Sequence, residues 1–105
     1  MKTTVRGRHL ELTEAIKSYA EKKFGKLEMY FNHIDETEVI LKYEDKKVYG
    51  VEVIVNTKGN KYIAKTKGGE LYAEIDKAKE KIKGVLTKEK KKLIDNKREE
   101  KIEVE

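Results

Sequence analysis

The 105-residue sequence predicts an α+β fold, a two-layer sandwich in which a four-stranded sheet carries two helices on one face. Two segments with apolar residues at helical spacing flank three segments in which apolar and polar residues alternate. Short polar turns join the alternating segments, which requires these three strands to pair antiparallel and leaves both helices to cover the sheet. The predicted element order is therefore β-α-β-β-β-α.

The N-terminal segment predicts one strand and the first helix. Residues 3–8 are expected to form a brief strand that Gly7 ends with a bulge or turn. Thr13 suits a helix N-cap, and the helix should run from about Glu14 to Tyr30. Its helical spacing is carried by Ile16, Tyr19, Ala20, Leu27 and Tyr30. Gly25 lies inside this helix at a cost of about 1 kcal/mol relative to alanine, and we interpret it as tolerated.

The rest of the chain predicts three strands and a long second helix. The strands are expected at 37–43, 48–56 and 61–67, with EDKK and NTKGN as the hairpin turns. Gly68 and Gly69 end the last strand, and the second helix should begin near Glu70. Its apolar stripe consists of Leu71, Ile75, Ala78, Ile82, Val85, Leu86 and Leu93. We expect one domain over residues 1–94 and a charged flexible tail over 95–105.

Composition narrows the classes of function. Lys and Arg number 25 against 20 Asp and Glu, a net charge of +5 that suits binding to a polyanion or simply solubility. The absence of cysteine excludes disulfides and thiolate metal sites. No segment approaches the roughly 20 apolar residues of a membrane span, and the N-terminus lacks a signal-like apolar stretch, so we expect a cytoplasmic protein without a membrane partner.

The sequence offers little for catalysis. Its one serine, Ser18, falls inside the first helix, and its two histidines, His9 and His33, stand apart near predicted loops. The KTKGGE segment lacks the ending of a phosphate-binding P-loop, so we interpret its glycines as a turn. We therefore expect no enzyme activity, no metal, no cofactor and no small-molecule substrate.

The lysines are sorted on the two helices rather than mixed with acids. At about 100° per residue, Lys77, Lys81, Lys88 and Lys92 form one row beside the apolar stripe of the second helix. Lys79, Lys83 and Lys90 form a second row on its other flank, and Asp76 and Glu80 are expected toward the outer face. In the first helix Lys22, Lys23 and Lys26 project to one side.

Lys23 is unusual because its predicted position falls within the apolar arc of the first helix. A buried ammonium without a partner is costly, so its head should reach the rim of the core or meet a ligand there. If the helices lie side by side, the lysines of the first would join one row of the second, with Tyr19 or Tyr30 between them. Such a surface suits a phosphate backbone, although lysine-rich helix faces are also common as plain solvated surface.

Three motifs carry a family resemblance: ELTEAI at the first helix, KFGKLEMYF at its end, and ELYAEID at the start of the second helix. Over Lys2 to Leu93 the chain resembles the ribosome hibernation promoting factor and ribosome-associated inhibitor family. The resemblance implies a fold similar to double-stranded RNA-binding domains. It also implies binding to the small ribosomal subunit in the channel for messenger and transfer RNA, inhibition of translation and stabilisation of idle ribosomes.

The resemblance and the sorted charges together give a candidate RNA-binding set. The family's basic helix positions map onto Lys23, Lys26, Lys81, Lys88, Lys90 and Lys92, and the charge rows add Lys22 and Lys77. Gly84 and Val85 depart from the family, because relatives often carry Arg-Gln there. We expect a monomer when the protein is free. Two alternatives stay open: a general double-stranded RNA-binding module, or a structural or interaction domain whose lysines are merely solvated.

Overall fold

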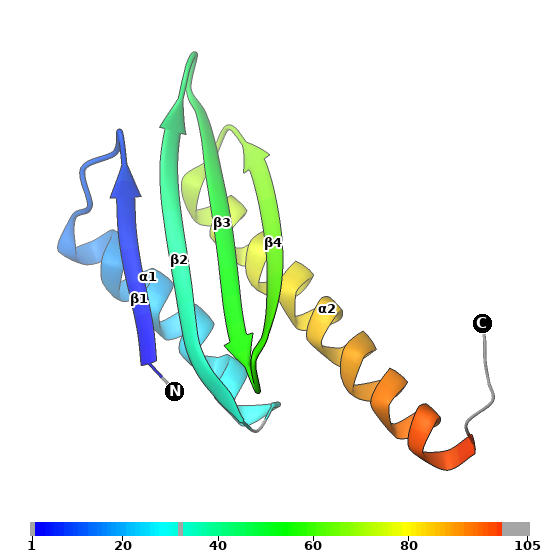
Figure 1. Cartoon of the computed structure of the whole chain (residues 1–105). Helices are drawn as coiled ribbons and strands as arrows, with labels where there is room; N and C mark the ends of the chain where they lie inside the picture. The colour runs from blue at the N-terminus through cyan, green and yellow to red at the C-terminus, as the bar shows by residue number, and fades with distance from the viewer. Residues whose placement is uncertain (1, 32, 100–105) are drawn as a thin grey trace.

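The computed structural model describes residues 2–31 and 33–99, with side chains described as far as Lys88. Its elements are β1 (Lys2–Arg8), α1 (Glu14–Gly25), the short 3-10 helix η1 (Lys26–Met29), β2 (Ile34–Glu44), β3 (Val48–Thr57), β4 (Asn60–Gly68) and α2 (Leu71–Glu99). Figure 1 shows the four strands side by side and α2 extending beyond them. The predicted order and the α+β class are confirmed.

The sheet is mixed, with the strand order β1-β2-β3-β4. β1 runs parallel to β2, whereas β2, β3 and β4 pair antiparallel as the hairpin turns predicted. One row across the sheet shows the register: Val5 pairs with Val39, Val39 with Val53, and Val53 with Ala64. All four side chains are buried, so the inward positions of every strand meet on the same face.

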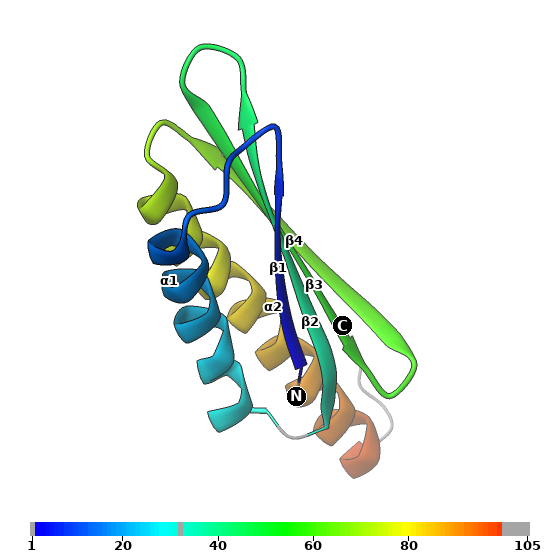
Figure 2. The ribbon, with the colours of Figure 1, turned by 90° about the vertical axis from the view of Figure 1, so that its left-hand side faces the viewer.

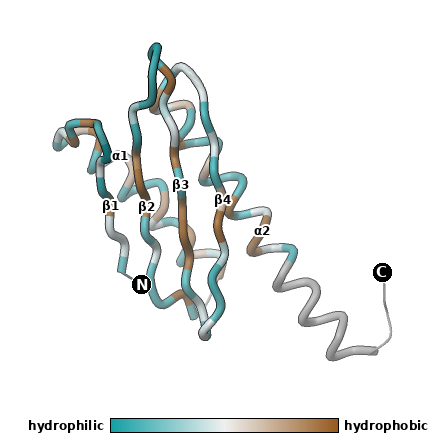
Figure 3. Tube along the Cα trace, turned by 45° about the horizontal axis from the view of Figure 1, so that its top comes forward, coloured by the Kyte–Doolittle hydropathy of each residue, from teal (hydrophilic) through white to brown (hydrophobic). Residues whose placement is uncertain are grey.

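Tight turns close both hairpins. The first turn has three residues between the paired Glu44 and Val48, and Lys46 and Lys47 in it have positive φ. The second turn has two residues, Lys58 and Gly59, both with positive φ, and such a turn matches the right-handed twist of the flanking strands. Figure 3 shows apolar stretches in the middle of the strands and a hydrophilic tip on the β2–β3 hairpin.

Both helices lie on the same face of the sheet (Figure 2). Thr13 is the N-cap of α1, because its Oγ1 accepts a hydrogen bond of 3.2 Å from the backbone N–H of Ile16. Phe24 from α1 and Ile75 and Ile82 from α2 are fully buried against the inward face of the strands. The core therefore fixes the helices as one layer, and their outer sides face solvent.

The first helix ends earlier than expected. The α-helix stops at Gly25, and Lys26–Met29 continue as a 3-10 helix instead of α-helix up to Tyr30. Glycine weakens the helix at this point, and the tighter turn places Leu27 fully inside the core. A Cβ added at Gly25 would meet no atom within 4 Å, so no close packing requires a glycine here. The interpretation of Gly25 as tolerated is confirmed.

The second helix begins where the sequence predicts and extends further. The Glu70 carboxylate accepts a hydrogen bond of 3.2 Å from the backbone N–H of Ala73, which caps the first turn. α2 then continues to Glu99, past the domain boundary expected at residue 94. That boundary stays a prediction, and the last part of the expected tail, 100–105, lies outside the described residues.

Candidate nucleic-acid interface

A three-residue cluster joins the two helices. The Tyr19 hydroxyl on α1 donates a hydrogen bond of 2.7 Å to Oδ1 of Asp76 on α2. The Lys23 ammonium lies 3.3 Å from the same oxygen and 5.6 Å from the centre of the Tyr19 ring. Tyr72 packs edge-on against Tyr19, with ring centroids 4.8 Å apart. The cluster links α1 to α2 at the half-buried edge of the core.

The hydrogen bond shifts the pKa of both its partners. Donation to Asp76 raises the pKa of Tyr19 to about 12, with burial adding to the shift. The same hydrogen bond, joined by the Lys23 ammonium, lowers the pKa of Asp76 below its ordinary 3.8. At neutral pH the phenol is therefore protonated, the carboxylate is ionised, and the contact has its strongest form.

One sequence expectation is corrected here. Asp76 was expected toward the outer face of the second helix, but it lies on the flank that faces α1, because it is about 100° around the helix from the buried Ile75. Lys23 was expected to reach the rim of the core or meet a ligand there, and its ammonium does lie at the rim, paired with an Asp76 side chain that is 48 % exposed. Its charge is already compensated, which makes it a weaker candidate for a phosphate contact.

The first lysine row of α2 lies beside the free edge of the sheet. The Lys81 ammonium donates a hydrogen bond of 2.9 Å to the backbone carbonyl of Lys65 in β4. Lys77 lies 3.1 Å from Oε2 of Glu74, a carboxylate whose residue is only 2 % exposed. These contacts hold the row against β4, whereas the exposed lysines of that strand, Lys61, Lys65 and Lys67, alternate with the inward Ala64 and point to the opposite face of the sheet.

The second row faces the end of η1. The Lys83 ammonium lies 4.3 Å from the centre of the Tyr30 ring, and Lys79 lies 5.9 Å from it. Lys79 also approaches the Glu80 carboxylate at 3.6 Å. The structure thus places Tyr30, one of the two tyrosines expected between the helices, against this row. Lys79 and Lys83 were outside the candidate set although their four-residue spacing identified the row.

The remaining candidate RNA-binding lysines are either exposed or have side chains beyond the described residues. Lys22 on α1, Lys26 on η1 and Lys88 on α2 are exposed, and none has an ion-pair partner among the side chains described up to Lys88. Lys90 and Lys92 belong to α2, but their side chains lie beyond that limit. The structure therefore separates candidate lysines that hold internal partners from those whose charge faces solvent.

The opposite face of the sheet carries three ion pairs. They join Arg6 to Glu38 at 3.3 Å, Lys42 to Glu52 at 3.4 Å, and Lys67 to Glu44 at 3.1 Å. The exposed Arg8, Lys61 and Lys65 lie on this face too, so it also carries positive charge. The lysine-rich helix layer attracts a polyanion chiefly through its phosphates.

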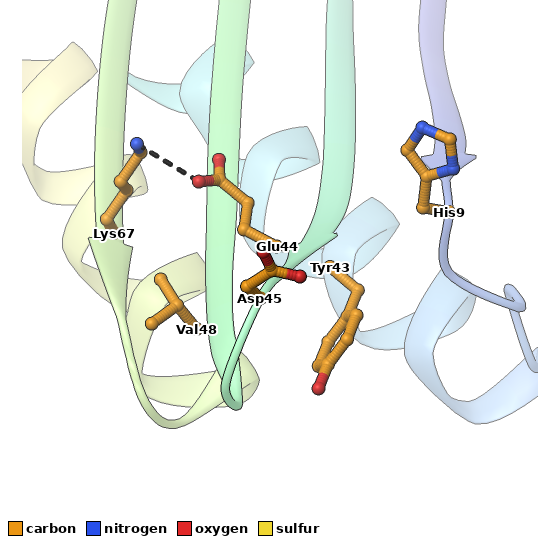
Figure 4. Close-up of a pocket in the computed structure, with 6 residues that line it drawn as sticks. All are labelled: His9, Tyr43, Glu44, Asp45, Val48 and Lys67. Carbon is orange, nitrogen blue, oxygen red and sulfur yellow. Dashed lines mark ion pairs between the residues drawn. The ribbon is translucent and has the colours of Figure 1, made fainter.

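A shallow hollow opens at the end of the sheet near the β2–β3 hairpin (Figure 4). It is lined by His9, Tyr43, Glu44, Asp45, Val48 and Lys67. Lys67 and Glu44 pair with each other there, and the exposed Asp45 adds a negative charge. Across the described part of the chain, no group of three histidines or acids is placed to hold a metal, and no helix is long and apolar enough to cross a membrane.

Comparison with known proteins agrees with the fold. The family described as sigma 54 modulation protein / S30EA ribosomal protein matches residues 3–94. Two similar relatives are both named ribosome hibernation promoting factor. The protein from Acidithiobacillus ferridurans is 37 % identical over 78 residues, which are 72 % of this chain and all of the relative. The protein from Escherichia coli K12 is 36 % identical over 93 residues, 89 % of this chain and 97 % of the relative.

A solved structure has the same architecture. The Thermus thermophilus Protein Y N-terminal domain superposes with a TM-score of 0.73 at 29 % identity, covering 81 % of this chain and 93 % of that domain. The chain belongs to the sigma 54 modulation protein / S30EA ribosomal protein family. The resemblance to ribosome hibernation factors is confirmed.

Proposed function

We propose that this protein binds the small ribosomal subunit through the helix layer, blocks the channel for messenger and transfer RNA, and keeps idle ribosomes inactive. The observation that carries the proposal is the position of the solvent-facing lysines. Lys22, Lys26 and Lys88 lie exposed on the helix layer with no ion-pair partner among the described side chains, and Lys81 is exposed there beside β4. The family membership and the names of the relatives support a ribosomal target.

The proposed mechanism is steric and electrostatic. Lysines that contact phosphates release condensed counterions, which gives affinity and makes it depend on salt. The folded domain then occupies space that the substrates of translation need, and no bond is made or broken. In this account the protein acts as a monomer in the cytoplasm, without metal or cofactor, and Lys23 and Lys77 contribute mainly by holding acids within the fold.

Charge reversal tests the proposed surface. The variant Lys22→Glu/Lys88→Glu should lose most of its binding to small subunits at moderate salt, because two phosphate contacts become repulsive. The matched control is Lys2→Glu/Lys61→Glu, which changes two exposed lysines of the strands β1 and β4, outside the helix layer, and alters the net charge equally. If both variants lose binding to small subunits equally, net charge alone explains the loss, which contradicts a specific binding surface. Unchanged binding in the first would indicate that these lysines are merely solvated.

The duplex RNA-binding alternative makes a different prediction. A general module should bind isolated double-stranded RNA about as well as it binds ribosomal subunits. Excess duplex RNA should therefore displace the protein from subunits under that alternative, and should leave most of it bound under the proposed function. The measurement is the amount of protein that sediments with small subunits as duplex RNA is added.

A further inference from the structure

An exposed apolar pair lies at the end of the first helix. Met29 is 77 % exposed and Tyr30 is 46 % exposed, whereas Leu27 just before them is fully buried. The backbone N–H groups of Tyr30 and Phe31 both donate to the carbonyl of Leu27, at 3.1 and 3.0 Å. The pair is therefore held in place by a hydrogen-bonded turn that Leu27 anchors in the core.

Lysines surround the Tyr30 ring. The ammonium of Lys83 lies 4.3 Å from its centre and that of Lys79 lies 5.9 Å away, both from α2. Lys26 is exposed one helical turn before Tyr30. Tyr30 as a residue is still 46 % exposed, so these contacts leave part of it accessible.

An aromatic ring beside cations is the combination that single-stranded nucleic acid requires. Every base has a flat face that stacks on an aromatic side chain, and the neighbouring phosphates need positive charge at the same place. An acidic peptide would use the ammonium groups but would gain little from the ring. A fully paired duplex would present phosphates but no free base face.

We propose that Tyr30 and Met29 form a stacking site for one unpaired RNA base, with Lys83 and Lys26 beside the flanking phosphates. This inference rests on the proposed function and deepens it, because it assigns the η1 end of the helix layer to single-stranded rather than paired RNA. Stabilisation of the fold alone would account for the lysine contacts, but it would not require Met29 and Tyr30 to stay exposed.

The test compares two short RNAs that share one stem, one fully paired and one with a single unpaired adenine. Wild type should bind the second more tightly. Tyr30→Leu should lose that preference. Its affinity for the RNA with the unpaired base should fall about tenfold, and its affinity for the paired RNA should stay as in wild type. Tyr30→Phe should retain the preference because it keeps the ring. The control Tyr43→Leu changes another exposed tyrosine, at the β2–β3 hairpin, and should behave like wild type.

Three results would overturn the stacking site: equal affinity of wild type for both RNAs, equal loss of both in Tyr30→Leu, or an unchanged preference in Tyr30→Leu. Binding of the wild type to small subunits is measured separately. If wild type does not bind small subunits, the proposed function is wrong. The comparison of the two RNAs tests the stacking site independently of that result.

Discussion

The Tyr19 hydroxyl donates a hydrogen bond of 2.7 Å to Asp76, and this contact joins the two helices of the proposed RNA-binding layer. Lys23 pairs with the same carboxylate oxygen at 3.3 Å. The relative position of the helices decides which lysines lie close together. The cluster is therefore as relevant to the proposed interface as the exposed lysines themselves.

Removal of the Tyr19 hydroxyl should weaken this contact between the two helices. Tyr19→Phe loses the hydrogen bond and leaves the half-buried Asp76 with Lys23 as its partner. We expect the free energy of unfolding to fall by about 1 kcal/mol, the usual net value of such a bond. Urea denaturation of both proteins measures it. A variant as stable as wild type would show that water replaces the contact without loss.

The same cluster predicts a pH dependence. The folded protein lowers the pKa of Asp76, so its contribution is present above the ordinary value of 3.8 and is lost as pH falls through the lowered value. Wild type should exceed Asp76→Ala in the free energy of unfolding at pH 7, and the difference should shrink as the solution is acidified toward pH 2. Denaturation curves at several pH values test this. A constant difference would contradict a role for the ionised carboxylate.

Gly68 and Glu74 should be energetically coupled. A Cβ added at Gly68 would overlap the Glu74 carboxylate, and that carboxylate is buried with no hydrogen-bond partner for its Oε1 within the described structure. Gly68→Ala should therefore destabilise the protein by roughly 1–3 kcal/mol. In Gly68→Ala/Glu74→Ala the cost of the alanine at 68 should largely disappear, since the overlapping group is gone. Additive effects of the two changes would contradict the contact.

Paired and unpaired lysines should respond differently to loss of charge. Lys23→Met removes the partner of Asp76, so it should reduce stability more than RNA affinity. Lys88→Met should change the free energy of unfolding by less than about 0.5 kcal/mol. It should also decrease the slope of log affinity against log salt by about 1, the value for one phosphate contact. Salt titrations and thermal melts of both variants distinguish the two roles, and the opposite pattern would contradict this assignment.

The helices and strands could be predicted from the sequence because the local spacing of apolar residues determines them. Alternation along the strands, Thr13 as a cap and the glycine-ended last strand predicted the element order, and the apolar stripes predicted which sides of the helices face the sheet. The register row from Val5 to Ala64 follows once the inward positions are known. The 3-10 turn after Gly25 was missed, since α and 3-10 spacing differ little over four residues.

The partners of individual lysines could not be predicted, because they depend on how separate elements pack. The sequence identified both lysine rows but not that Lys81 contacts the carbonyl of Lys65, nor that Asp76 faces Lys23. Lys81 and Lys65 are separated by 16 positions in the chain, and Asp76 and Lys23 by 53. Only the packing of α2 against β4 and α1 brings these residues together.

Co-sedimentation with separated small and large ribosomal subunits tests whether the protein recognises the small subunit. We expect the protein to sediment with small subunits but not with large ones. Its binding to small subunits should weaken as salt rises and should change little when excess duplex RNA is added. Equal binding to both subunits, or no binding to either at low salt, would contradict recognition of the small subunit.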